Sequence, residues 1–186
     1  MIIFGLGNPG LRYRHTRHNA GHLFLERLAK YYKKRFSRRQ YHTKSVIAID
    51  AAEVILVKPR CWMNLCGSTI QRILERYDED FMVVLDDINL PLGRMRLRSK
   101  GSDGGHLGLR SVIDALRSTN FPRLRIGIGQ PEIDTEDYVL SRFTTAERRA
   151  LLEVIDEGIK GIQIMVGQGF VRAQNHINSV DIKDVS

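Results

Sequence analysis

The 186-residue sequence has few cysteines, few prolines and no long hydrophobic run. Cys61 and Cys66 are too few for a disulfide framework and do not form a C-x2-C zinc pair, so we expect a reducing, cytoplasmic setting. The first residues, MIIFGLGNPG, lack the basic start of a signal peptide, and no run of about 18 uncharged apolar residues suggests a membrane span. With only 5 prolines and 16 glycines, a collagen-like or disordered chain is also excluded.

What remains is the composition of a folded domain. Apolar residues make up 42% of the sequence and charged residues 27%. A chain of this length buries roughly 70% of its unfolded surface on folding, which is enough for a hydrophobic core. No repeat or linker divides the sequence. We therefore expect a single domain over residues 1–186, with the residues after about 178 as a loose tail.

Positive charge is in excess and unevenly placed. The sequence has 29 Lys and Arg against 21 Asp and Glu, a net charge of +8. Residues 12–44 hold eleven basic residues and one acid, Glu26, while residues 94–125 hold eight basic residues and two acids. Clustered positive charge favours a polyanion such as nucleic acid as the partner, with a solvated surface as the alternative. A membrane surface is less favoured because no basic amphipathic helix with aromatic anchors is present.

Apolar periodicity indicates strands that alternate with helices. Strands are expected at residues 2–6, 46–49, 54–57, 81–85, 94–98 and 124–128. Helices are expected from residue 20, over 70–77, over 109–116, and from a capping box at Thr144 and Glu147 through residue 162. This order predicts an α/β domain with a twisted, largely parallel (mixed) sheet and helices on both faces, in which 94–98 is an antiparallel addition. Ligands bind such sheets beyond the carboxyl ends of the strands.

A glycine pattern after the first strand resembles a dinucleotide-binding fingerprint. Gly5, Gly7 and Gly10 match G-x-G-x-x-G. The third glycine should lie inside a helix, but Pro9–Gly10 forms a turn, and the expected acid would be Glu26, inside the predicted helix. We therefore do not favour a dinucleotide site.

Three histidines lie close together in the sequence. His15, His18 and His22 have the spacing H-x2-H-x3-H, but Asn19 replaces the glutamate of a zinc-binding H-E-x-x-H. Metal binding is therefore not favoured, and surface histidines in a basic segment are the simpler interpretation. His18, just before the start of the first predicted helix, is nevertheless a candidate base.

Polar residues follow the apolar strands at the expected ligand edge. Asp86 comes directly after the 81–85 strand, where a carboxylate can orient a histidine and stabilise its charged form. Asp87 is the weaker candidate, and we expect it to be solvated. Asn8 and Asn64 carry amides that can hold a carbonyl, a water or a peptide, although Asn8 can also serve as a turn former and Asn64 as a helix N-cap.

Motifs for a covalent nucleophile or for nucleotide hydrolysis are missing. The sequence has no G-x-S-x-G and no Walker A pattern, and no basic partner can be identified for either cysteine. A histidine–aspartate pair without such a nucleophile favours hydrolysis by a water that the histidine activates.

Six motifs, in order, carry a resemblance to a known family. GLGNPG, TRHNAG, WMNLCG, DDINLPLG, GSDGGHLGL and FPRLRIGIG resemble those of bacterial-type peptidyl-tRNA hydrolase, from Ile2 to about Asn178. The resemblance implies a monomeric α/β enzyme of translation that cleaves the ester between a peptide and the 3′-adenosine of its tRNA. It implies no metal and no cofactor.

The resemblance also implies roles for individual residues. His18 matches the catalytic histidine and Asp86 the aspartate paired with it. Asn8 and Asn64 match amides that hold the peptide and the attacking water. Further matches are the cleft residues Tyr13 and Met63 and the histidine of GGHNG, His106, all three expected to bind substrate. Two basic positions that clamp tRNA phosphate match Arg98 and Arg125.

One position departs from the family pattern. The family's GGHNG is Gly104–Gly108 here, with Leu107 in place of the asparagine. At 100° per residue, Leu107 lies roughly 170° from the apolar face of the predicted helix, so we expect it to face the cleft. Leucine offers no hydrogen bond, so a positioning contact is lost or supplied by a neighbour. The alternative function is a non-catalytic RNA-binding protein on this scaffold, as in the plant organelle splicing factors that resemble the family.

Overall fold

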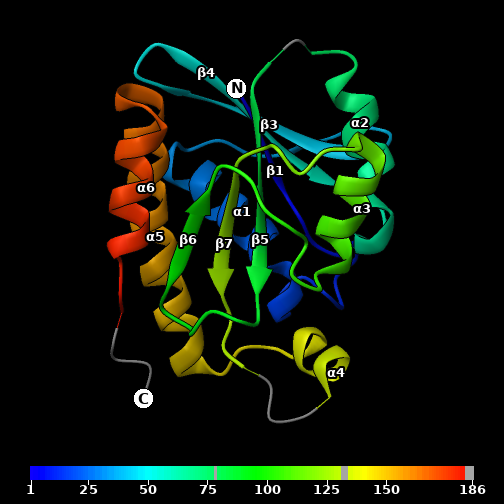
Figure 1. Ribbon diagram of the computed structural model, residues 1–186, viewed down its shortest axis with the longest axis vertical. Coiled ribbons are helices and arrows are strands. Elements are labelled where there is room, and N and C mark those ends of the chain that lie inside the picture. The colour runs from blue at the N-terminus through cyan, green and yellow to red at the C-terminus, as the bar shows by residue number, and fades with distance from the viewer. Residues whose placement is uncertain (78, 131–133, 183–186) are drawn as a thin grey trace.

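The computed structural model describes residues 1–77, 79–130 and 134–182. Its described strands form one seven-stranded sheet in the order β2-β3-β4-β1-β5-β7-β6 (Figure 1). The four central strands are parallel: β4 (Ala52–Pro59), β1 (Ile2–Gly5), β5 (Phe81–Asp87) and β7 (Arg123–Gly127). Antiparallel strands flank them: β2 (Ser37–Arg38), β3 (His42–Ile49) and β6 (Met95–Arg98). The predicted mixed sheet and its antiparallel addition at 94–98 are confirmed.

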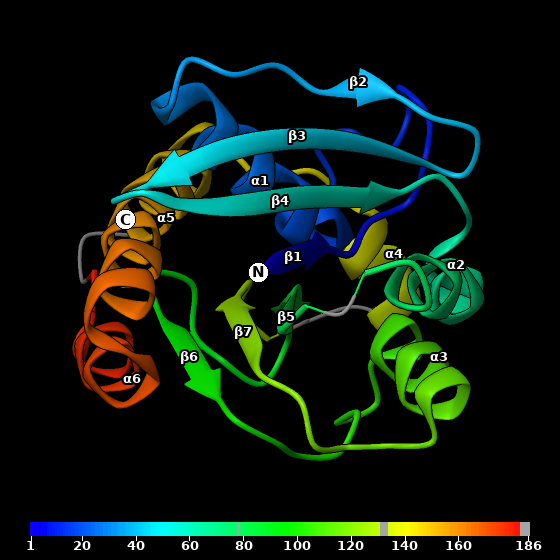
Figure 2. The same cartoon turned by 90° about the horizontal axis from the view of Figure 1, so that it is seen from above.

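Helices cover both faces of the sheet, as predicted. The twisted sheet separates α2 (Cys66–Leu74) and α3 (Leu107–Leu116) from α1 (Ala20–Tyr31), α5 (Thr145–Gln168) and α6 (Phe170–Ser179), as Figure 2 shows. The short helix α4 (Thr135–Leu140) lies near the carboxyl ends of β5 and β7 (Figure 1). Two 3-10 turns, η1 (Arg17–Asn19) and η2 (Met63–Leu65), precede α1 and α2. No helix in the described ranges is long and apolar enough to cross a membrane.

The central strands are apolar on both sides because each side meets a helix layer. Ile3 packs into the core under α1 and α5, whereas Ile2 and Phe4 pack into the core under α2 and α3. The uninterrupted apolar run of β5 has the same cause, since Val84 belongs to one core and Val83 to the other.

Helix α5 begins where the capping box predicted. The Thr144 hydroxyl accepts a hydrogen bond from the Glu147 backbone N–H at 3.2 Å, and the Thr144 N–H donates to the Glu147 carboxylate at 2.7 Å. At the far end of the chain, the Ile182 N–H donates to the Gly93 carbonyl, and Arg94 forms an ion pair with Asp181. The rest of the expected loose tail, residues 183–186, lies outside the described residues.

Candidate active site

A cleft of about 800 Å3 opens beyond the carboxyl ends of β1, β4 and β5. It is also bordered by the loop before α3 and by α4. Of the nine site residues expected from the sequence, every one except Arg98 lines this cleft. They are Asn8, Tyr13, His18, Met63, Asn64, Asp86, His106 and Arg125. Side chains from distant parts of the sequence therefore meet at the edge where the fold predicts a ligand.

His18 lies in η1, whose position is set by close packing and by a partly buried ion pair. A side chain at Gly21 would collide with the backbone of Leu6 and Val84, so glycine lets α1 approach the sheet closely. Arg17 is only 5% exposed, and its Nη2 lies 2.8 Å from both carboxylate oxygens of Glu147. These contacts join η1 to the sheet and to α5, which fixes where the His18 imidazole enters the cleft.

His18 and Asp86 form the pair that the sequence suggested. The His18 Nδ1 lies 3.0 Å and 2.9 Å from the two carboxylate oxygens of Asp86. Asp86 is 2% exposed, and a proton on Nδ1 donates to this buried carboxylate. Burial alone lowers the pKa of His18, but the charge of Asp86 and its hydrogen bond outweigh burial and hold that pKa above its ordinary value. The Nε2 lone pair is then left to accept a proton.

A second histidine shares the same carboxylate. The His106 Nε2 lies 3.0 Å from Asp86 Oδ1, while its Nδ1 accepts the backbone N–H of Leu109 at 3.0 Å. An Nδ1 that accepts places the proton on Nε2, so His106 donates to Asp86. Burial alone raises the pKa of Asp86, but His18 and His106 outweigh it and hold that pKa well below its ordinary value. Both ring nitrogens of His106 are therefore engaged within the protein.

The two histidines and Asp86 place ligand atoms within 4.8 Å of one another, a spacing that a metal ion could use. Two ligands at about 2.0 Å from a tetrahedral ion lie about 3.3 Å apart, whereas each imidazole here lies 2.9–3.0 Å from Asp86. These contacts are therefore direct hydrogen bonds.

The H-x2-H-x3-H histidines do not converge, because His22 is buried against Gly7 behind the cleft. Burial and Lys58 lower the pKa of His22 to about 3.

Asn8 is held in one orientation by the backbone around it. Its Oδ1 accepts the Met63 N–H at 2.9 Å, which directs the amide NH2 group the other way. The Asn19 side chain accepts the Asn8 N–H at 2.8 Å and donates to the Asn8 carbonyl at 3.0 Å. Asn8 is thus a fixed donor and more than a turn former. The sequence did not single out Asn19, since its partner is eleven residues away.

Asn64, by contrast, is exposed and lines the cleft. It is not the N-cap of α2, because Leu65 holds that position.

Two aromatic rings form one wall of the cleft. The Tyr13 and Trp62 rings pack edge to face with centroids 5.7 Å apart. Trp62 is 50% exposed, so an apolar wall borders the polar floor of the cleft.

The two arginines assigned to phosphate binding have different surroundings. Arg125 lines the cleft, and its Nε lies 3.0 Å from Asp87 Oδ2. The expectation that Asp87 is solvated is therefore wrong: it is 4% exposed because it pairs with Arg125. Arg98 is exposed on β6, outside the cleft, and Arg96 on the same face of that strand lies directly opposite Arg125.

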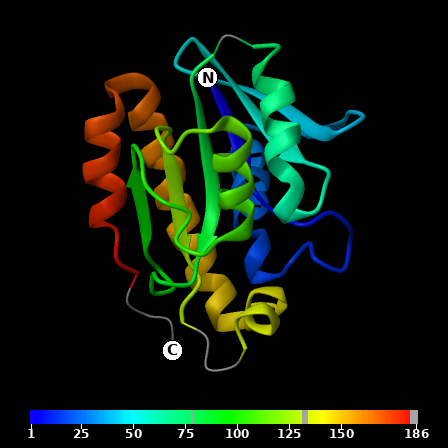
Figure 3. The same cartoon turned by 45° about the vertical axis from the view of Figure 1, so that its right-hand side comes forward.

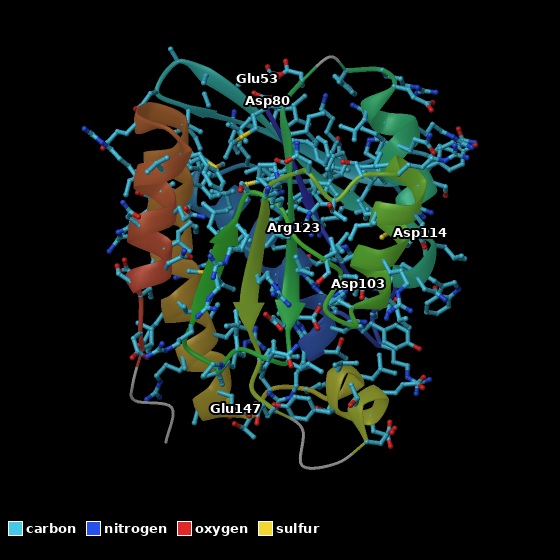
Figure 4. The ribbon with its side chains drawn as sticks, viewed as in Figure 1. Glu53, Asp80, Asp103, Asp114, Arg123 and Glu147 are labelled. Atoms are coloured by element: carbon cyan, nitrogen blue, oxygen red, sulfur yellow. The ribbon has the colours of Figure 1, made fainter. Side chains whose placement is uncertain are left out.

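Arg123 is a buried cation that the sequence did not single out. It is 1% exposed and donates to the carbonyls of Gly101, Thr119 and Phe121. Burial, together with nearby Arg125, lowers its pKa to about 10. Figure 4 shows Arg123 inside the molecule beside β7, with Asp103 next to the start of α3. Arg123 therefore links the chain on both sides of α3 and supports the loop that carries His106.

Comparisons with known proteins identify the family of this chain. The family model described as peptidyl-tRNA hydrolase matches residues 2–185. This chain belongs to that family. Peptidyl-tRNA hydrolase from Chloroflexus aggregans is 44% identical over 186 residues, covering 95% of this chain and 98% of that protein. The Bacillus subtilis protein of the same name is 37% identical over 96% of this chain and 98% of its own. A crystal structure of peptidyl-tRNA hydrolase from Acinetobacter baumannii has a TM-score of 0.91 at 31% identity, covering 97% of this chain and 95% of that one.

Leu107 remains the departure from the peptidyl-tRNA hydrolase pattern. It lines the cleft and is 54% exposed, so the expectation that it faces the cleft is confirmed. It is the first residue of α3, directly after His106. Its side chain presents an apolar surface to the cleft beside the half-buried His18 and His106.

Proposed function

We propose that this chain hydrolyses the ester bond between a peptide and the 3′-adenosine of peptidyl-tRNA, which frees the tRNA for translation. The observation that carries this proposal is the His18–Asp86 pair at the cleft, with Nδ1 held by the carboxylate and Nε2 left to act as a base. Among the described residues that line the cleft there is no serine or cysteine, so the pair supports attack by water.

The reaction needs two proton movements through one nitrogen. His18 Nε2 takes a proton from water as the water oxygen bonds to the ester carbonyl carbon. The tetrahedral intermediate then breaks its bond to the 3′-oxygen, and Nε2 returns the proton to that oxygen. Asp86 stabilises the imidazolium between these steps, and His106 keeps Asp86 oriented by donating to it.

Amide side chains position the substrate in this proposal. The Asn8 NH2 group, directed into the cleft by the Met63 N–H, donates to a peptide carbonyl. Asn64 holds the attacking water, while Tyr13 and Met63 line the peptide path. Arg98 and Arg125 contact tRNA phosphate, which supplies affinity without reading base sequence. The scheme needs no metal or cofactor, and we expect a monomer in the cytoplasm, where peptidyl-tRNA arises.

The second candidate, a non-catalytic RNA-binding protein, is favoured only by the apolar Leu107 in the cleft. Single-turnover incubation with N-acetyl-aminoacyl-tRNA separates the two. Release of the acetyl-amino acid supports the hydrolase, whereas bound but intact substrate supports the binder and contradicts our proposal. A time course without protein measures spontaneous hydrolysis and serves as the control.

A further inference from the structure

A second basic surface lies outside the cleft, where the β2–β3 edge meets α2. It consists of six cations around His42, and we call it the His42 surface: Arg38, Arg39, Lys44, Arg60, Arg72 and Arg76. The loop between β2 and β3 lies beside α2 (Figure 3). The Arg72 guanidinium stacks over the Tyr41 ring at 4.8 Å, and Lys44 lies 5.2 Å from the centre of the Tyr77 ring.

The positive charges of this surface have no acidic partner among the described residues. None of the six cations forms an ion pair within 4.0 Å, although ion pairs occur elsewhere on the protein. Their partners are neutral: Arg60 donates to the Arg39 carbonyl at 3.0 Å, and Lys44 donates to the Tyr77 hydroxyl at 3.3 Å. The pKa of His42 is lowered, first by burial and then by the charges of Lys44, Arg39 and Arg76. The contribution of these charges reflects the positive potential of the surface.

The His42 surface is continuous with the cleft. The Arg60 N–H donates to the Tyr41 carbonyl at 2.9 Å, and Trp62, two residues later, lines the cleft. Lys44 contacts Tyr77, just past α2, so Lys44 lies on the face of the sheet that α2 and α3 cover. Arg38, in register with Thr43, lies at the edge of the sheet on the other face. Arg96, Arg98 and Arg125 lie on the same face as Lys44, on β6 and β7. Strands β3 and β7 are four strand spacings apart, about 19 Å, which is less than one turn of a nucleic-acid double helix, about 34 Å.

We propose that the His42 surface binds the phosphate backbone of the tRNA substrate outside its acceptor terminus. This inference rests on the proposed function for the identity of the RNA. Arginines and lysines that have no ion pair with any described residue, interleaved with tyrosines, suit a phosphate backbone. Exposed arginines can form paired hydrogen bonds to phosphate oxygens. Contacts of this kind read no base, so they suit a substrate that varies in sequence.

The test removes charge without disturbing packing. Arg38, Arg39 and Arg76 are exposed, so the triple variant Arg38→Gln, Arg39→Gln, Arg76→Gln should fold normally. The matched control is Lys30→Gln, Lys33→Gln, Lys34→Gln, which removes the same charge at the C-terminal end of α1, away from the β2–β3 loop (Figure 2). Two readouts are used: the Kd for full-length tRNA by fluorescence anisotropy, and single-turnover cleavage of an N-acetyl-aminoacyl ester of the trinucleotide CCA.

We expect the triple variant to bind full-length tRNA roughly 5- to 30-fold more weakly, with a salt slope lower by about 2–3. Cleavage of the CCA ester should stay at the wild-type rate, and the lysine control should bind as wild type. Unchanged tRNA affinity in the triple variant, or an equal loss in the control, would overturn the proposed surface. If the wild type binds but does not cleave N-acetyl-aminoacyl-tRNA while the triple variant still loses tRNA affinity, the hydrolase proposal fails and the RNA surface stands.

Discussion

The cleft and the His42 surface use polar side chains in opposite ways. In the cleft, Asp86 accepts from two histidines and Asn8 is held by the backbone of Met63, so each side chain has one orientation. On the His42 surface, Arg38 and Arg39 are exposed and have no ion-pair partner in the described parts of the chain. The contrast suggests that paired groups fix the geometry of the reaction, whereas unpaired charges attract a mobile polyanion.

Removing the base should have the largest effect on the reaction in the cleft. We predict that His18→Ala lowers the single-turnover rate by roughly 100- to 10,000-fold, because it removes the imidazole that takes the proton from water. Affinity for tRNA should remain close to wild type, in contrast to the triple variant of the His42 surface. Rapid-quench measurement of acetyl-amino acid release, with anisotropy for binding, checks both. A variant that stays active would remove His18 from the mechanism.

A polar side chain in place of Leu107 should raise the reaction rate in the cleft. Leu107→Asn places an amide at the start of α3, and we predict a rate about tenfold higher, since one positioned hydrogen bond commonly contributes that much or more. Leu107→Ala is the control, because it removes the leucine without adding a donor. Equal rates in all three proteins would show that a neighbour already makes this contact.

The smallest effect concerns the network that holds η1. Glu147→Ala removes the carboxylate from buried Arg17 and one half of the capping box, so we expect it to lower the free energy of unfolding by about 3 kcal/mol. Thr144→Ala removes only the cap and should lower the free energy of unfolding by about 1 kcal/mol. Urea denaturation measures both. Equal losses would mean that the Arg17 ion pair adds little to stability.

The sequence allowed the fold and the location of the site to be predicted because both depend on local patterns. Strand–helix alternation indicated the sheet, and Asp86 was found because it directly follows an apolar strand. Among the described elements, one strand and two α-helices were missed: β2 has two residues, α4 has six, and α6 follows α5 after a single residue, Gly169, with φ of 90°.

Pairings between distant residues were not predictable in the same way. Asp87 looked solvated because its partner, Arg125, lies on another strand. His106 was identified from its motif, but its bond to Asp86 depends on how the loop before α3 folds back over β5. Arg17 and Asn19 gave no sequence signal, since their partners lie eleven or more residues away.

The central claim is that His18, oriented and charge-stabilised by Asp86, removes the proton from water. The most direct measurement is the pH dependence of the single-turnover rate for the wild type and Asp86→Asn. Only unprotonated His18 can act as the base, so the wild-type rate should rise with pH through an apparent pKa above the ordinary histidine value. In Asp86→Asn the loss of negative charge should move this pKa lower and reduce the plateau rate by roughly 10- to 1000-fold. The same apparent pKa and plateau in both proteins would contradict the account.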